Sequence, residues 1–162
     1  MNELIEIRNM YKIYNPGENE VRALDNVSLT IHENEFVAII GQSGSGKSTL
    51  MNMLGCLDVP SAGQYFLNGA DVSHMRDDDL SDIRNKEIGF IFQDFKLMRE
   101  QTVYDNVAIA KRITGAKEKD ILAMVTMALR TVGMEKDFYR PVAELSGGEQ
   151  QKVCVARAIV GN

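Results

Sequence analysis

The residues best suited to chemistry lie in one short glycine-rich segment. It matches the pattern G-x-x-x-x-G-K-S/T through Gly41, Gln42, Ser43, Gly44, Ser45, Gly46, Lys47, Ser48 and Thr49. Glycines let the backbone curl so that successive N–H groups converge on phosphate oxygens. The Lys47 ammonium would then reach the β- and γ-phosphates, and the Ser48 hydroxyl would ligate Mg²⁺. The segment predicts a nucleoside triphosphate site.

The elements on either side of this segment support that interpretation. Residues 36–40 form a continuous apolar run, which predicts a strand buried on both faces of a parallel sheet. Residues 47–54 predict a helix, with Gly55 as its left-handed end. A flexible Gly/Ser linker is the alternative, but a linker needs neither a strand before it nor a Lys-Ser-Thr helix start after it. The order strand, loop, helix is the context that phosphate binding requires.

The nucleotide is expected to be ATP. Guanine-specific sites carry N/T-K-x-D, and the nearest segment here, residues 85–88, lacks the aspartate. An aromatic ring to stack on adenine would be supplied by Tyr11 or Tyr14. Both tyrosines also fit ordinary packing at a strand edge, so their types and positions leave the choice open.

The remaining pattern predicts an α/β lobe followed by a helical lobe. Short strands are expected at 4–7, 27–31 and 88–93, a turn at 24–26, and a hairpin after 64–67 at Asn68-Gly69. Helices are expected at 103–113 and 149–160, with a third through Ile121, Val125 and Leu129 that ends at Gly133. We place the ATP-binding lobe at 1–93 and the helical lobe at 94–162.

Composition excludes several classes of protein. The 162 residues fit one ordinary domain, and a net charge of -5 argues against a broad basic surface for nucleic acid. The 2 cysteines, Cys56 and Cys154, suit small buried side chains rather than a disulfide framework. We expect no signal peptide and no membrane span, so the chain is expected to be cytoplasmic.

A second distinctive string is Leu-Ser-Gly-Gly-Glu-Gln-Gln at residues 145–151. Ser146 and Glu149 have the spacing of a capping box, in which two side chains satisfy free N–H groups at a helix start. A capping box does not explain Gly147 and Gly148, because glycine in a helix costs up to about 1 kcal/mol relative to alanine. Close approach of the backbone to an anionic ligand does explain them.

The phosphate loop and this second string together resemble the ATP-binding subunits of ABC transporters, and within them the lipoprotein-releasing and macrolide-export type. Residues 46–52, 55–58, 88–93 and 145–157 carry the likeness, which covers nearly the whole chain. The resemblance implies a P-loop NTPase core with an antiparallel β subdomain and a helical signature subdomain. It also implies that Tyr14, rather than Tyr11, stacks on adenine.

The resemblance implies roles for other residues. Gln93 matches the glutamine that contacts Mg²⁺ and the attacking water, so the expected catalytic residues are Lys47 and Gln93 and the expected metal ligands are Ser48 and Gln93. Ser146, Gly147 and Gly148 match the signature that reaches the γ-phosphate bound to a second copy. The implied protein is an ATPase subunit that uses ATP and Mg²⁺ and couples hydrolysis to transport. Its partners would be a head-to-tail second copy and an integral-membrane permease at the cytoplasmic face of the cell membrane, with no nucleic acid.

One departure from the family pattern affects catalysis. Family members continue into an apolar strand that ends Asp-Glu and later supply a switch histidine, whereas this sequence stops at Asn162, and neither His32 nor His74 takes that place. The C-terminal part of the core is therefore expected to be missing from this chain, which alone would not hydrolyse ATP. As a substitute, Asp94 could serve as the metal aspartate of a smaller P-loop enzyme, although Gln93 occupies the strand end.

Two alternative functions follow from the same motifs. One is an ATP-binding module without hydrolysis. The other is a soluble ABC ATPase of translation or chromosome maintenance, although the long coiled coil or second domain of those proteins does not fit this length. For the transporter hypothesis, Phe95, Leu97 and Met98 are predicted to line a groove for a short helix of the permease.

Overall fold

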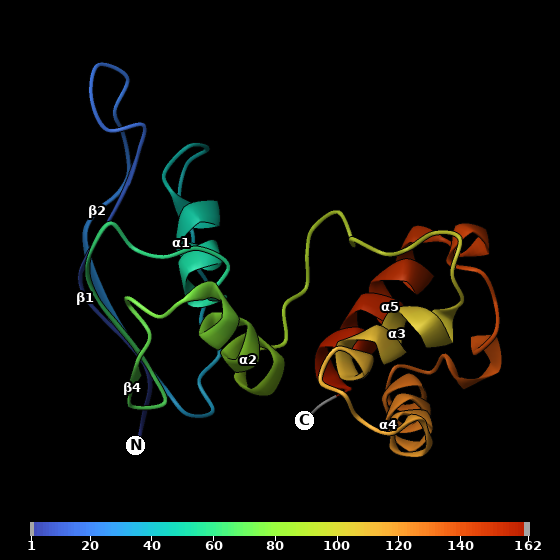
Figure 1. The fold of residues 1–162 in the computed structure, drawn as a ribbon. Coiled ribbons are helices and arrows are strands. Elements are labelled where there is room, and N and C mark those ends of the chain that lie inside the picture. The colour runs from blue at the N-terminus through green and yellow to red at the C-terminus, as the bar shows by residue number, and fades with distance from the viewer. Residues whose placement is uncertain (1, 161–162) are drawn as a thin grey trace. The chain divides into compact units, whose positions relative to one another are not determined.

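The computed structural model describes residues 2–160 and divides the chain into two compact units between Ile83 and Arg84. Figure 1 shows strands and a first pair of helices in the blue and green part of the chain, and helices in the yellow to red part. Helix α2 (Asp77–Glu87) crosses the division. The lobe boundary predicted at residue 93 remains a prediction.

The first unit contains one antiparallel sheet. Its strands are β1 (Glu3–Tyr14), β2 (Val21–His32), β3 (Ala62–Leu67) and β4 (Ala70–Asp71), in the order β2-β1-β3-β4. The predicted hairpin is confirmed, because Asn68 (φ 49°) and Gly69 (φ 78°) join β3 to β4 in left-handed conformations. With the helices, the sheet gives the expected α/β class.

The turn predicted at residues 24–26 is wrong, because those residues lie inside β2. The asparagine that suggested a turn forms a bulge instead. Asn26 (φ 54°) contacts Asn9 of β1 (φ 47°), and Nδ2 of the Asn9 side chain donates to Oδ1 of Asn26 at 2.8 Å. The register of the two strands shifts between Ile7 and Met10, where Asn9 lies, and again opposite Asn26, between Met10 and Lys12. Asparagine tolerates left-handed backbone, so it can serve a bulge as well as a turn.

Helix α1 (Lys47–Leu54) has the predicted bounds, but its end differs from the prediction. Gly55 has φ -79°, and the left-handed residue is Cys56 at φ 51°. The Leu57 amide donates to the Asn52 carbonyl at 2.9 Å, and the Cys56 amide donates to Met53 at 3.0 Å. These two bonds form a Schellman ending. They place the left-handed position one residue later than the glycine.

The strands predicted at residues 36–40 and 88–93 do not form. Both segments are irregular, and Phe36 and Ile40 are 100% and 89% exposed, where burial was expected. Their apolar pattern is that of strands covered on both faces. A strand also needs a hydrogen-bonded neighbour, and neither segment has one in residues 2–160.

The second unit is a helical bundle. Its helices are α3 (Val103–Arg112), α4 (Glu118–Thr131) and α5 (Gly147–Ile159), with short 3₁₀ turns at Glu135–Asp137 and Val142–Glu144. The predicted apolar face of α4 is confirmed, since Ile121, Val125 and Leu129 are fully buried. Those residues share one core with Val107 of α3 and Val153 of α5. The three predicted helices therefore exist and pack on one another.

Cys56 and Cys154 are buried and form no disulfide, as expected. Within residues 2–160, the longest helices are too short and too polar to cross a bilayer.

Candidate functional site

The phosphate loop bends sharply into α1 through Gly46. This residue caps the helix at φ 86°, and a Cβ atom added there would lie 2.2 Å from the backbone oxygen of Ala23 in β2. A side chain is therefore excluded twice, by the left-handed backbone and by the close approach of β2. The first unit thus fixes the start of α1 against its sheet.

The Lys47 side chain folds back over the loop. Its ammonium donates to the carbonyl oxygens of Gly41 at 2.9 Å and Gln42 at 2.5 Å, and it lies 3.4 Å from the Ser45 hydroxyl. The Ser45 amide closes the loop on the Gln42 carbonyl at 3.3 Å. A cation is therefore held inside a curl of backbone at the positive end of a helix. This arrangement suits a phosphate group.

The side chains expected to surround a nucleotide are accessible. Gln42, Ser43 and Ser48 are exposed, and Thr49 is half-buried. Residues 2–160 contain no cluster of His, Cys, Asp or Glu that could hold a metal alone. Mg²⁺ in nucleotide sites keeps waters and phosphates as ligands and takes only one or two from the protein. The hydroxyl of Ser48 and the amide oxygen of Gln93 fit that demand in chemical type.

Tyr14 lies at the end of β1 and is tied to the loop after α1. Its hydroxyl donates to Oδ2 of Asp58 at 3.2 Å, and the Lys12 ammonium lies 5.1 Å from the centre of its ring. About a third of Tyr14 is exposed, which leaves ring surface for a ligand. The phosphate loop and this ring therefore belong to one unit, joined through the two ends of α1.

Asp58 is a residue that sequence reasoning missed as a contributor to the site. Besides Tyr14, it accepts from Lys12 at 2.7 Å and from the Val59 amide at 2.8 Å. Partial burial raises the pKa of Asp58, but the hydrogen bonds from Lys12, Val59 and Tyr14 outweigh it, so the pKa lies below its ordinary value. The only sign of this role in the sequence is that Asp58 lies in the segment 55–58, which carries part of the resemblance to the ABC transporter family.

In the second unit, Gln93 occupies a tight turn. The Phe95 amide donates to the Phe92 carbonyl at 3.1 Å, so Gln93 and Asp94 are the central residues of the turn, and both are exposed. Asp94 pairs with the Lys96 ammonium at 2.6 Å, and this hydrogen bond holds the pKa of Asp94 below its ordinary value. Asp94 is thus engaged by a lysine of its own turn.

The predicted capping box at the start of α5 is confirmed. Ser146 is the cap residue, and Glu149 accepts from its amide and its hydroxyl, each at 2.8 Å. The backbone N–H of Ser146 is the main cause of a lowered pKa at Glu149. Arg140 also contacts Glu149 at 3.2 Å. A cation and two hydrogen bonds therefore hold this helix start rigid.

The two glycines that follow have no packing reason within the described chain. A Cβ atom added at Gly147 or Gly148 would meet nothing within 4 Å, and both residues are exposed. Neither needs a left-handed backbone, since both begin a regular helix. The open backbone at this helix start is therefore available to an external group.

The three residues predicted to line a groove, Phe95, Leu97 and Met98, are in part engaged in contacts within the second unit. Leu97 packs against the helical core, and Phe95 is half-buried. The backbone of Met98 is held by the fully buried Asn106, which accepts from the Met98 amide at 2.7 Å and donates to its carbonyl at 3.0 Å. Sequence reasoning missed Asn106, because a polar residue on a helix carries no local sign of burial.

Comparison with known families agrees with this geometry. The model of the family described as "ABC transporter" matches residues 24–162, which include the phosphate loop and the start of α5. The chain belongs to the ABC transporter family. Membership of this family carries nucleotide binding.

Curated relatives within the family share a name. The macrolide export ATP-binding/permease protein MacB of Chlorobaculum tepidum is 50% identical over 97% of this chain, and MacB of Hyphomonas neptunium is 45% identical over 98%. The chain spans only 24% and 25% of those two proteins. A quarter of their length corresponds to this ABC portion.

Solved structures have the same fold. The dimeric structure of a bacterial ABC transporter cassette aligns with a TM-score of 0.87 at 37% identity, covering 97% of this chain and 69% of that one. A post-hydrolysis state of that cassette, bound to ADP and Pi, aligns with a TM-score of 0.88 at 36% identity. The expected P-loop NTPase fold of an ABC cassette is thereby confirmed.

Proposed function

We propose that this chain is the ATP-binding part of an ABC transporter that couples ATP binding and hydrolysis to movement of a substrate across the membrane. The observation that supports it most directly is the Lys47 ammonium, held by the carbonyls of Gly41 and Gln42 at the start of α1. Such a cation can bind the phosphates of a nucleotide while the backbone N–H groups of the loop surround them. The MacB relatives are named as ATP-binding/permease proteins.

The proposed catalysis is positioning and charge stabilisation. Lys47 neutralises charge on the β- and γ-phosphates, and Tyr14 supplies a platform for adenine. Ser48 and Gln93 would hold Mg²⁺, which would supply positive charge to the phosphates, and Gln93 would also orient the attacking water. These residues bind and align the nucleotide.

A second copy is the proposed partner at Ser146, Gly147 and Gly148. Two exposed glycines at a helix start weaken the helix and leave its N–H groups open, which suits contact with an anion brought from outside. A related cassette has been solved as a dimer. In a head-to-tail pair, each signature would cover the γ-phosphate of the opposite copy, giving two equivalent sites.

The other proposed partner is an integral-membrane permease, which places the protein at the cytoplasmic face of the cell membrane. The names of the MacB relatives, which join ATP-binding and permease functions, support it. Phe95, Leu97 and Met98 would contact the permease beside the Gln93 turn. Nucleic acid is not a proposed partner, given the net charge of -5.

The test is nucleotide binding and hydrolysis by the complete protein that contains this chain. Calorimetric titration with Mg-ATP should give saturable heat, and phosphate release should follow at a rate that depends on Lys47. Binding without hydrolysis would favour the non-hydrolysing module instead. Absence of any heat would refute the proposal.

A further inference from the structure

Two bulky residues directly after the Gln93 turn have left-handed backbones. Phe95 has φ 63° and Lys96 has φ 47°, and neither is glycine, asparagine or aspartate. The Lys96 amide donates back to the Asp94 carbonyl at 2.7 Å, which tightens the segment further. Residues in such conformations persist only where the surrounding structure holds them there. Something must therefore hold this segment.

The holding groups come from α5. Arg157 donates through Nη1 to the Lys96 carbonyl at 2.7 Å and through Nη2 to the Phe95 carbonyl at 2.8 Å. The Cys154 thiol, one turn earlier, also lies 3.2 Å from the Phe95 carbonyl. Burial raises the pKa of Cys154, so the thiol keeps its proton and can donate it. Three donors thus meet two neighbouring carbonyls at the strained point.

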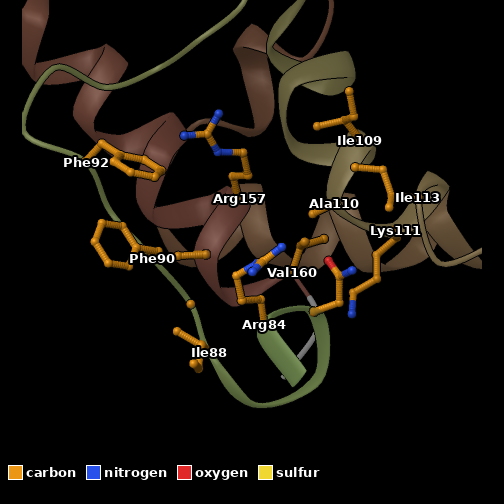
Figure 2. A pocket seen from close by; sticks show the side chains of 13 residues that line it. Arg84, Ile88, Phe90, Phe92, Ile109, Ala110, Lys111, Ile113, Arg157 and Val160 are labelled. Carbon is orange, nitrogen blue, oxygen red and sulfur yellow. The ribbon is translucent and has the colours of Figure 1, made fainter. Parts of the chain in front are cut away.

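The guanidinium is suited to this geometry. Its N–H groups form a rigid planar fork, so one arginine can donate to two adjacent acceptors at once. Figure 2 shows Arg157 beside Phe92, lining a cavity of about 320 Å³ in this unit. The segment before the turn is also pressed on α5, since a Cβ atom at Gly89 would lie 2.6 Å from the Ala158 backbone oxygen. The turn is therefore fixed to α5 from both sides.

We propose that Arg157 is a positioning residue that fixes the Gln93 turn to the helix whose first residues are the Ser146–Gly148 signature. The inference rests on the proposed function, because it assigns a role to Gln93. In this role Arg157 acts through Gln93 and not on the nucleotide itself. Through its two hydrogen bonds, the glutamine of one copy and the signature of that same copy form one rigid body, so closure of a signature on its partner's nucleotide would move both together.

The first test is kinetic and uses the complete protein. Arg157→Met keeps an apolar stem but removes both donors. We expect kcat to fall about 10- to 100-fold, because small misplacement of an aligned group costs that much, while the dissociation constant for a non-hydrolysable ATP analogue stays unchanged. Arg130→Met, at an exposed arginine of α4, is the matched control and should leave both values unchanged.

The second test asks whether the loss passes through Gln93. Gln93→Ala alone should lower kcat, and adding Arg157→Met should lower it little further, because both changes remove the same aligned group. If kcat of the double variant falls by the product of the two single-variant factors, the proposal is contradicted. Hydrogen exchange gives a readout without activity: amides 95 and 96 should exchange faster in Arg157→Met, with those of α3 unchanged.

The third test uses the backbone strain. Glycine adopts left-handed backbone readily, so Lys96→Gly should restore part of the kcat lost in Arg157→Met. If Arg157→Met does not fold, Arg157→Lys is tested instead, with and without Lys96→Gly. A fall in kcat that Lys96→Gly reverses supports the proposal. Any other result overturns it. If the wild-type protein hydrolyses no ATP, the proposed function is wrong. The hydrogen-exchange comparison of wild type and Arg157→Met would still test whether Arg157 holds the Gln93 turn on α5.

Discussion

The ammonium of Lys12 lies 2.7 Å from Oδ1 of Asp58, in an ion pair that joins β1 to the loop after α1. Lys12 is nearly buried and also donates to the Val59 carbonyl at 2.8 Å. Asp58 in turn accepts from the hydroxyl of Tyr14. This network connects Tyr14, the proposed adenine platform, to the loop after α1, the helix that follows the phosphate loop.

Acid should weaken the first unit through Asp58. Its pKa in the folded chain lies below the unfolded value of about 3.9, so the network stabilises the fold fully above that value. Stability is then lost as pH falls through the folded pKa. Urea denaturation of wild type and Asp58→Asn from pH 7 to pH 3 checks this. The difference between them should shrink in acid.

Lys47→Ala should abolish most of the proposed activity. The change removes the cation that contacts Gly41 and Gln42 and would contact phosphate in their place. By comparison with loss of a transition-state donor, hydrolysis should slow on the order of 10²–10³-fold, or about 3–4 kcal/mol. Phosphate release by the complete protein measures it, with Lys152→Ala on the exposed side of α5 as control. Normal hydrolysis by Lys47→Ala would show that the assignment is wrong.

The features predicted well from the sequence are those that depend on neighbours along the chain. The hairpin at Asn68-Gly69, the bounds of α1 and the capping box of Ser146 and Glu149 each need only a few consecutive residues. Their hydrogen bonds close within one turn, so residue type and spacing determine them.

The features missed depend on residues far apart in the chain. Lys12 and Asp58 are 46 residues apart, and Arg157 and Lys96 are 61 apart, so no local pattern announces either contact. The apolar segments 36–40 and 88–93 failed for a related reason. An apolar run predicts that a segment will be buried. The hydrogen bonds that make the segment a strand come from another part of the chain.

Gly46 and Gly44 should respond differently to the same substitution. Both have left-handed backbones, at φ 86° and 79°, so alanine is strained at each by about 1–2 kcal/mol. Only at Gly46 does the new Cβ atom meet another group, the Ala23 backbone oxygen at 2.2 Å. Gly46→Ala should therefore cost about 1–3 kcal/mol more than Gly44→Ala in urea denaturation. Equal costs would mean that β2 does not approach α1 this closely.

Gly147→Ala and Gly148→Ala should make the chain more stable and the proposed enzyme less active. Alanine favours a helix over glycine by up to about 1 kcal/mol, and a Cβ atom at either position meets nothing in the chain. Gly133→Ala is the matched control with the opposite sign, because Gly133 has φ 70° and alanine is strained there.

The melting temperature should therefore rise for Gly147→Ala and Gly148→Ala and fall for Gly133→Ala. Hydrolysis by the complete protein should drop for the first two and stay near wild type for Gly133→Ala. The opposition between stability and activity is what separates a glycine kept for an external anion from one kept for the backbone. Variants at 147 and 148 that gain stability and hydrolyse ATP at the wild-type rate would remove the reason for placing a second copy's phosphate at this helix start.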